Sequence, residues 1–216
     1  MILNKIVVID YGFGNQFSIK QAFKALNYEI KTTSDPRDIV NATNIILPGV
    51  GAFKRAMEEL KRLNLDAPIK NAANDGIPIL GICLGMQLLF ETSEEFGFAK
   101  GLNLISGDVK VLPSTSKDGK GLKKPNIGWS KISINQELQP SLNTDFNLLN
   151  DASYYFIHSY GAKVKKIKNV VSYVNFGDHL IPAIVKHKNI YGFQFHPEKS
   201  GINGLKLLDL YIRQKI

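Results

Sequence analysis

A cysteine flanked by glycines at a strand-to-helix junction is the feature that most constrains this chain. The apolar run over residues 77–82 (IPILGI) predicts a strand buried on both faces, and helical spacing follows at once over residues 84–91. Between them the letters GICLG have the form G-x-C-x-G, the cysteine version of a nucleophile elbow. Such a turn strains its central residue and brings the chain close to itself on both sides, so it requires small neighbours.

At such an elbow the central side chain projects above the carboxyl ends of a parallel sheet, where open α/β sheets bind ligands. The first turn of the following helix adds peptide dipoles that favour a thiolate. A free cysteine is more often a small buried apolar residue, but the glycines and the junction favour a nucleophile here. We therefore predict that Cys83, the one cysteine in 216 residues, is catalytic. An intrachain disulfide and a multi-cysteine metal site are excluded.

A thiolate nucleophile requires a base, and the base requires a group that orients it. Of the four histidines, His179 and His187 lie among charged residues, where solvation is expected. His196 ends an apolar strand and begins the sequence His-Pro-Glu, so that Glu198 can accept from one imidazole nitrogen and leave the other for the thiol. His158 also follows an apolar run and is the alternative base, although a core histidine bonded to backbone fits it better.

A tetrahedral intermediate also requires an oxyanion hole. The sequence Pro-Gly-Val-Gly at residues 48–51 directly follows a predicted strand and could supply backbone N–H groups. Its glycines would let the segment approach a substrate closely or change the orientation of a peptide. A tight turn between a strand and a helix explains the same letters equally well, so the motif alone does not decide between the two.

The first half of the chain alternates apolar, β-branched runs with segments of helical spacing. Strands are predicted over residues 5–10, 28–32, 44–47 and 77–82, and helices over residues 17–26, 54–63 and 84–91. This order predicts a parallel α/β sheet with right-handed crossovers.

The second half contains many short strands instead. They are predicted over residues 102–112, 131–134, 153–157, 170–174, 183–185 and 191–195, followed by a closing amphipathic helix over residues 203–214. Antiparallel pairs joined to the main sheet are expected here. Two polar stretches, residues 113–128 and 135–150, are predicted to be surface loops.

Length and composition set limits on the whole molecule. With 216 residues, 44% hydrophobic and 21% charged, the chain is predicted to form a single domain over residues 1–216. The net charge is +8, but the lysines are scattered and we find no nucleic-acid motif, so a solvated basic surface is expected. No apolar run approaches the ~20 residues that span a bilayer, and no secretory leader is recognised. We expect a soluble, cytoplasmic protein that binds neither nucleic acid nor membrane.

Together these motifs resemble those of the class I (triad-type) glutamine amidotransferases. The two most specific are GICLGMQLL around Cys83 and GFQFHPEKS around His196. Four further motifs resemble the glutaminase subunit of imidazole glycerol phosphate synthase (HisH type): IDYGFGN from Ile9, LPGVGAF from Leu47, PNIGWS from Pro125 and YYFIHSY from Tyr154. The resemblance covers essentially the whole chain.

The resemblance implies a flavodoxin-like, three-layer α/β/α fold with a mostly parallel central sheet and inserted antiparallel strands. It also implies that Cys83 attacks the side-chain amide of glutamine, that His196 protonates the leaving ammonia, and that Glu198 orients His196 while water hydrolyses the thioester. By motif position, the oxyanion residues are Gly49, Val50, Gly51 and Leu84, and the glutamine-binding residues are Gln87, Glu95, Ser159 and Tyr160. No cofactor and no metal is implied.

The family also implies a partner, because free ammonia is mostly protonated at neutral pH and escapes easily. Its members form a heterodimer with a (β/α)8-barrel synthase and channel ammonia into it, which favours a role in histidine biosynthesis here. Nothing in the chain looks like an acceptor site. Positions that match the docking face of the family are Asn15, Trp129, Ser130, Tyr155 and Lys199. Trp129 could instead anchor a core or a loop.

Departures from the family pattern keep other functions open. Ser130 stands where the family usually has asparagine, and the segment over residues 111–125 looks longer than usual and carries four lysines. One alternative is a paralogous glutaminase subunit whose synthase amidates a bacterial surface sugar. A catalytically silent interaction subunit and a peptidase-like hydrolase are further alternatives, against which the intact triad and the glutamine-binding residues argue.

Overall fold

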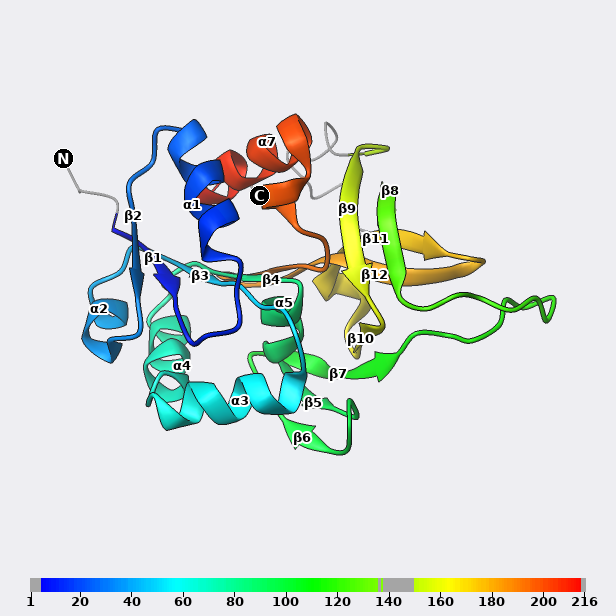
Figure 1. Cartoon of the computed structure of the whole chain (residues 1–216), viewed down its shortest axis with the longest axis horizontal. Coiled ribbons are helices and arrows are strands. Elements are labelled where there is room, and N and C mark those ends of the chain that lie inside the picture. The colour runs from blue at the N-terminus through cyan, green and yellow to red at the C-terminus, as the bar shows by residue number, and fades with distance from the viewer. Residues whose placement is uncertain (1–4, 136, 138–149, 215–216) are drawn as a thin grey trace.

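The computed structural model describes residues 5–135, 137 and 150–214 (Figure 1). Its larger sheet begins with five parallel strands in the order β2 (Ile30–Thr33), β1 (Ile6–Ile9), β3 (Asn44–Leu47), β4 (Ile79–Ile82) and β13 (Ile190–Phe193). It continues through antiparallel pairs with β12 (His179–His187), β11 (Val170–Phe176), β8 (Asn126–Ile134) and β9 (Ser153–His158). The parallel part has the strand order of flavodoxin-like folds.

Helices cover both faces of this sheet, which gives the three layers seen in Figure 1. One face carries α1 (Gln16–Ala25) and α7 (Gly201–Ile212). The other carries α3 (Phe53–Arg62), α4 (Asp66–Asn74) and α5 (Leu84–Leu88), with the short α2 (Pro36–Val40) beside α4. The predicted α/β/α fold class is confirmed. None of the described helices is long and apolar enough to cross a membrane.

A smaller sheet lies on the α3 and α5 side. Its described strands follow the order β10 (Tyr160–Val164), β7 (Ile105–Val111), β5 (Phe90–Ser93) and β6 (Ala99–Lys100). Strand β7 is antiparallel to β10 and parallel to β5. Because β9 ends at His158 and β10 begins at Tyr160, the chain passes from one sheet to the other at Ser159.

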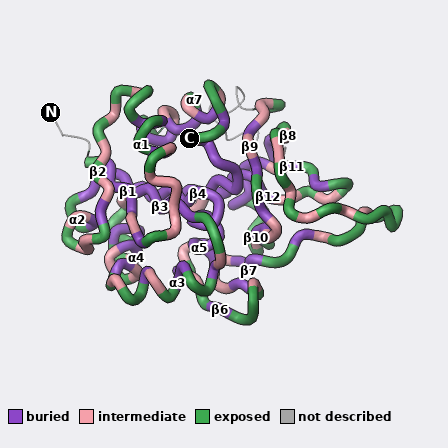
Figure 2. The backbone as a smooth tube through the Cα atoms, viewed as in Figure 1, coloured by how far each residue is buried: buried purple, intermediate pink, exposed green. Residues whose placement is uncertain are grey.

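Both faces of β1, β3, β4 and β13 are buried, as their mostly apolar sequences predict, whereas the edge strand β2 is partly exposed. In β1, Ile6 and Val8 pack in the cluster that includes α1 and α7, while Val7 and Ile9 pack in the cluster that includes α3 and α4. Figure 2 shows the buried strands at the centre of the molecule. Burial of each such side chain contributes roughly 1.5–3 kcal/mol to the stability of the fold. The loops at the carboxyl edge of the sheet are therefore attached to a stable core.

The structure corrects the helix predicted over residues 84–91. Helix α5 ends at Leu88, and Phe90 already begins β5, which pairs with β6 and β7. The apolar run fits either structure by itself, and the hydrogen bonds that the neighbouring strands offer make it a strand.

The sequence pattern also misses the helices α2 and α4, the strands β6 and β10, and the first part of β8. For α2 a signal exists, because Asp35 caps the helix and Pro36 lies in its first turn. Strand β8 begins at Asn126, inside the loop predicted over residues 113–128, because it pairs with β9 from that residue onward. The other predicted loop, residues 135–150, lies almost entirely outside the described residues. The remaining predicted strands and helices are found, with their ends displaced by a few residues.

A glycine lets α5 pack directly against the end of β3. A Cβ atom at Gly85 would overlap with the carbonyl oxygen of Leu47, whereas one at Gly121 would meet open space. We predict that Gly85→Ala lowers the free energy of unfolding by about 3 kcal/mol or more, because backbone must move. Gly121→Ala should change it by less than about 0.5 kcal/mol. Urea unfolding followed by circular dichroism measures both, and equal stability of the two variants would contradict this packing.

Candidate active site

The cysteine between two glycines forms a sharp turn between β4 and α5. Cys83 has φ 54° and ψ −110°, a backbone conformation that is rare for a residue with a side chain. Its N–H donates to the carbonyl oxygen of Phe193 at 2.7 Å, which holds the residue against β13. A Cβ atom at Gly81 would lie 2.5 Å from the carbonyl oxygen of Gly85. The structure therefore contains the predicted elbow, and close backbone contacts explain both glycines.

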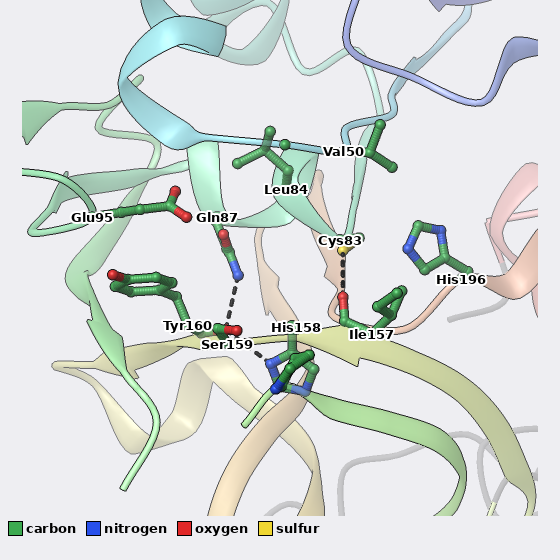
Figure 3. A pocket seen from close by; sticks show the side chains of 12 residues that line it. Val50, Cys83, Leu84, Gln87, Glu95, Ile157, His158, Ser159, Tyr160 and His196 are labelled. Carbon is green, nitrogen blue, oxygen red and sulfur yellow. Dashed lines mark hydrogen bonds between the residues drawn. The ribbon is translucent and has the colours of Figure 1, made fainter. Parts of the chain in front are cut away.

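A pocket of about 290 Å³ lies over this turn (Figure 3). His196 lies on one side of Cys83, and Gln87 and Glu95 lie on the other. Ser159, where the chain changes sheets, also lines the pocket. Residues predicted from separate motifs thus share one cavity. Among the described residues, no group of three or more His, Cys, Asp or Glu side chains is arranged to hold a metal ion.

His196 and Glu198 form a buried pair beside the cysteine. Nδ1 of His196 lies 2.8 Å from Oε1 of Glu198, and the two side chains are 2% and 1% exposed. Nε2 of His196 has no hydrogen-bond partner among the described residues, so it is available to the thiol. Burial lowers the pKa of His196, but the neighbouring Cys83 and Glu198 outweigh burial and raise this pKa to about 10. This is the arrangement expected of a histidine oriented by a carboxylate.

His158 lines the pocket, but both of its ring nitrogens are engaged in hydrogen bonds within the protein. Its Nδ1 lies 2.8 Å from the carbonyl oxygen of Tyr160 and its Nε2 lies 3.1 Å from Nδ2 of Asn126, so Nδ1 donates and Nε2 accepts. Burial, helped by the charge of His196, lowers the pKa of His158 to about 4 despite the Tyr160 carbonyl. A neutral ring with both nitrogens engaged fits the core histidine that the sequence favours, rather than the alternative base.

Two amides predicted for the oxyanion hole are engaged within the protein. The Leu84 N–H donates to the carbonyl oxygen of Gly49 at 3.3 Å, and the Val50 N–H donates to that of Phe13 at 3.0 Å. Val50 and Gly51 do line the pocket. The Leu84 N–H is therefore not free to donate to a substrate in this structure, because it donates to the Gly49 carbonyl oxygen. A rotation of the peptide between Gly49 and Val50 would release Leu84 and redirect the amide of Val50.

Gln87 and Glu95 present acceptor oxygens at the other end of the pocket. Nε2 of Gln87 donates to the carbonyl oxygen of Tyr160 at 2.9 Å and to Oε1 of Gln194 at 3.2 Å, which leaves Oε1 of Gln87 as an acceptor. Oε2 of Glu95 accepts from the N–H of Phe53 at 2.7 Å, at the start of α3. Burial raises the pKa of Glu95, against the effect of this hydrogen bond. Acceptors of this kind suit an ammonium group.

Two strands beside the pocket carry an exposed apolar surface. Ile127 and Trp129 of β8 pair with Ile157 and Tyr155 of β9, so the four side chains share one face, here called the β8–β9 patch. Trp129 is 59% exposed, and its ring packs edge-on against that of Tyr155 with centres 6.3 Å apart. It is therefore not a core anchor. The carbonyl oxygen of Ile157 lies 3.8 Å from the sulfur of Cys83, so one residue of the patch also contacts Cys83.

The other residues predicted for a docking face lie in different settings. Asn15 is partly buried, and its Oδ1 accepts from the N–H of Ser18, which caps α1. Lys199 is exposed in the short 3-10 helix η3 (Pro197–Lys199), directly after Glu198. Ser130 alternates to the opposite face of β8 from Trp129 and pairs with the buried Tyr154.

Three residues that line or hold the site are not predicted from the sequence. Gln194 is fully buried, and its Nε2 lies 4.0 Å from the sulfur of Cys83. A signal for it exists, because it is a polar residue between two phenylalanines and two positions before His196. Ile157 and Pro125 carry no such signal, because the antiparallel pairing of β8 and β9 brings them to the pocket.

Comparison with families of known proteins matches residues 7–210 to the family described as "Glutamine amidotransferase class-I". The chain is similar to imidazole glycerol phosphate synthase subunit HisH of Geobacillus sp. (strain WCH70), with 43% identity over 206 residues and 95% of each chain covered. It is also similar to subunit HisH 1 of the same synthase from Legionella pneumophila (strain Paris). That identity is 39% over 212 residues, which cover 98% of this chain and 100% of the relative.

Solved structures share the fold at lower identity. A crystal structure of a glutamine amidotransferase superimposes with a TM-score of 0.72 at 16% identity, covering 96% of this chain and 98% of the other. The structure of PurLQS from Thermotoga maritima gives a TM-score of 0.70 at 20% identity, with 99% of both chains covered. At these identities the likeness is one of fold.

We predict that acid weakens folding through His158. Its pKa falls from the ordinary 6.5 to about 4 on folding, so between these values the unfolded chain binds more protons and stability declines as the pH falls. The loss amounts to roughly 2 kcal/mol at about pH 4.5, and His158→Gln should remove it. Urea unfolding near neutral pH and near pH ~4.5 tests this. An equal loss in the variant and the wild type would rule His158 out as the source.

Proposed function

Because this chain belongs to the class I glutamine amidotransferase family, we propose that it is the glutaminase subunit that supplies ammonia to imidazole glycerol phosphate synthase. The observation that carries this proposal is the triad geometry. His196 is held by Glu198 at 2.8 Å, and its Nε2, without a partner among the described residues, belongs to the pocket that contains Cys83. The family match over residues 7–210 supports one glutaminase domain.

In the proposed reaction the Cys83 sulfur attacks the side-chain carbonyl carbon of glutamine and forms a tetrahedral adduct. His196, as imidazolium, gives its Nε2 proton to the leaving nitrogen, so the C–N bond breaks, ammonia departs and a thioester remains. The neutral His196 then takes a proton from water, whose oxygen attacks the thioester carbon and releases glutamate and the thiolate. Glu198 accepts from Nδ1–H throughout and keeps the ring oriented.

The far end of the pocket suits the backbone end of a free glutamine. We propose that Oε1 of Gln87 and the carboxylate of Glu95 accept from the α-ammonium group. The support is that Nε2 of Gln87 is already used by Tyr160 and Gln194, so its oxygen is the atom available to a ligand. The main chain at Ser159 and Tyr160 borders the same end, where the α-carboxylate would lie.

The engaged amides suggest that the isolated chain is nearly inactive. A developing oxyanion would require the Leu84 and Val50 N–H groups, and both donate to carbonyl oxygens of the protein, those of Gly49 and Phe13. We propose that docking of the synthase subunit favours the rotated peptide. In support, Phe13 belongs to the loop before α1 that also contains Asn15, so a contact at Asn15 adjoins the residue that holds Val50.

The partner is proposed to be a (β/α)8-barrel subunit that covers the β8–β9 patch. Exposed tryptophan beside other apolar side chains is typical of interface hot spots, and Trp129 is such a residue. Because Ile157 belongs to the patch and contacts Cys83, ammonia would be released next to the docked subunit. The relatives named above are subunits of imidazole glycerol phosphate synthase, which supports histidine biosynthesis as the pathway.

A different ammonia acceptor should be tested directly, because the segment before β8 looks longer than is usual in the family. It carries Lys117, Lys120, Lys123 and Lys124 and leads into the patch. A paralogue that serves a sugar-amidating synthase would alter this surface. The chain should be purified with the barrel subunit of the same organism and given glutamine and the ribonucleotide of the histidine pathway. A complex that hydrolyses glutamine but leaves the ribonucleotide unchanged would favour the sugar synthase.

We predict that Cys83→Ala lowers glutamate release by roughly 10³-fold or more, because the nucleophile is lost. Glutamate is measured with the barrel subunit and an acceptor analogue present, and Gly121→Ala serves as the control for an unrelated substitution. Equal rates for wild type and Cys83→Ala would refute the enzyme and favour a catalytically silent subunit. High activity of the wild-type chain without its partner would contradict the role proposed for the engaged amides.

We predict that Trp129→Ala weakens binding of the barrel subunit by about 2 kcal/mol, roughly 30-fold in Kd. Val40, on α2 and far from the pocket, is also exposed, so Val40→Ala is the matched control and should bind as wild type does. Titration calorimetry measures both. If the two variants bind equally well, the β8–β9 patch is not the docking face.

A further inference from the structure

We propose that Gln194 is a positioning residue that aligns the nucleophile and the substrate-binding Gln87 through the two ends of one amide group. This inference rests on the proposed function of the pocket. Gln194 follows β13 directly, and its side chain is fully buried. Its backbone N–H donates to the carbonyl oxygen of Ala183 at 2.9 Å, which continues the pairing with β12.

The packing of the segment after β13 shows which way this side chain points. Phe193 and Phe195 stack on each other with ring centres 5.5 Å apart, so both occupy one side of the segment. The chain bends at residues 194 and 195, and the Gln194 side chain lies instead against Gln87 and Cys83. His196 lines the pocket. Gln194 is thus directed to the same region by its side-chain contacts, two residues before the proposed base.

The hydrogen bonds of Gln87 fix the orientation of the Gln194 amide. Nε2 of Gln87 donates both to the carbonyl oxygen of Tyr160 at 2.9 Å and to Gln194 at 3.2 Å. Gln194 must present its oxygen to this donor, because an NH₂ group there would face another donor. Its own NH₂ group is consequently turned toward Cys83, with Nε2 4.0 Å from the sulfur. The assignment of oxygen and nitrogen is set by this network.

Two consequences follow from one amide in this position. Its N–H favours a negative sulfur over a neutral one, because a hydrogen bond to a charged acceptor is stronger than one to a neutral acceptor. Its oxygen keeps Nε2 of Gln87 in place, which leaves Oε1 of Gln87 directed at the ligand. Gln194 would therefore affect both the reactivity of Cys83 and the binding of glutamine. A residue that only fills the core would affect neither once the protein is folded.

The test compares Gln194→Met with Gln87→Met. The first variant removes both contacts at similar side-chain volume, whereas the second keeps the Gln194 amide and removes only the donor that orients it. Alkylation of Cys83 by iodoacetamide is followed over pH in the isolated chain, with the modified peptide identified by mass spectrometry. Glutamine KM is measured with the barrel subunit present. We expect Gln194→Met to shift the alkylation profile upward by about one pH unit, and both variants to raise KM roughly tenfold.

Asn189→Leu is the control for a lost internal amide. The Asn189 side chain donates to the carbonyl oxygens of Ala73 and Ile77, away from the pocket. The Asn189→Leu variant should lower the melting temperature without moving the alkylation profile. A Gln194→Met variant that melts lower but keeps the wild-type profile would overturn the inference. If that variant does not fold, Gln194→Asn replaces it, because the shorter amide cannot reach both partners and should shift the profile in the same direction.

The outcomes separate this inference from the proposed function. If wild-type Cys83 is not alkylated faster as pH rises, and the complex releases no glutamate, the glutaminase proposal itself fails. If the wild type reacts normally and Gln194→Met or Gln194→Asn has an unchanged profile, only the positioning role of Gln194 fails.

Discussion

The positive φ of Cys83 is the constraint on which the rest of the site depends. An L-residue does not keep this conformation unless its surroundings hold it. Here a hydrogen bond from its own N–H to the Phe193 carbonyl oxygen of β13 holds it on one side, and α5 lies so close to β3 that Gly85 has no room for a Cβ atom. Because the strands involved are buried on both faces, the turn has little freedom to relax. The sulfur is consequently presented above the carboxyl edge of the sheet.

The pocket lies where the chain passes between two sheets, and this explains why distant motifs meet there. Strand β9 ends and β10 begins on either side of Ser159. The same crossing brings Ile157 to the sulfur and the carbonyl oxygen of Tyr160 to Gln87. One face of β9 therefore belongs to the exposed β8–β9 patch while its end borders the proposed active site. A protein docked on the patch would lie close to Cys83.

The hydrogen bonds around the elbow also show how the amides proposed for the oxyanion hole can be ordered and still not point at a substrate. An unpaired buried N–H costs free energy, so leaving the amide of the buried Leu84 without an acceptor would destabilise the fold. The Leu84 and Val50 amides are instead satisfied by the main chain at Gly49 and Phe13. A change to a catalytic arrangement would exchange these bonds for bonds to substrate. A partner that binds the rotated form better than the present one could supply the difference.

The sequence alone predicts the parallel half of the sheet, the elbow at Cys83 and the His-Pro-Glu pair, because each depends on residues close together in the chain. Apolar runs, flanking glycines and a proline act locally and leave a readable pattern. The tertiary structure decided that Phe90 begins a strand, that β8 starts at Asn126 and that Gln194 touches the sulfur. It also decided the present state of the Gly49 peptide. Each of these depends on a partner that is distant in sequence. Several arrangements would satisfy the same hydrogen-bonding groups, and a local sequence pattern does not determine which one the folded molecule adopts.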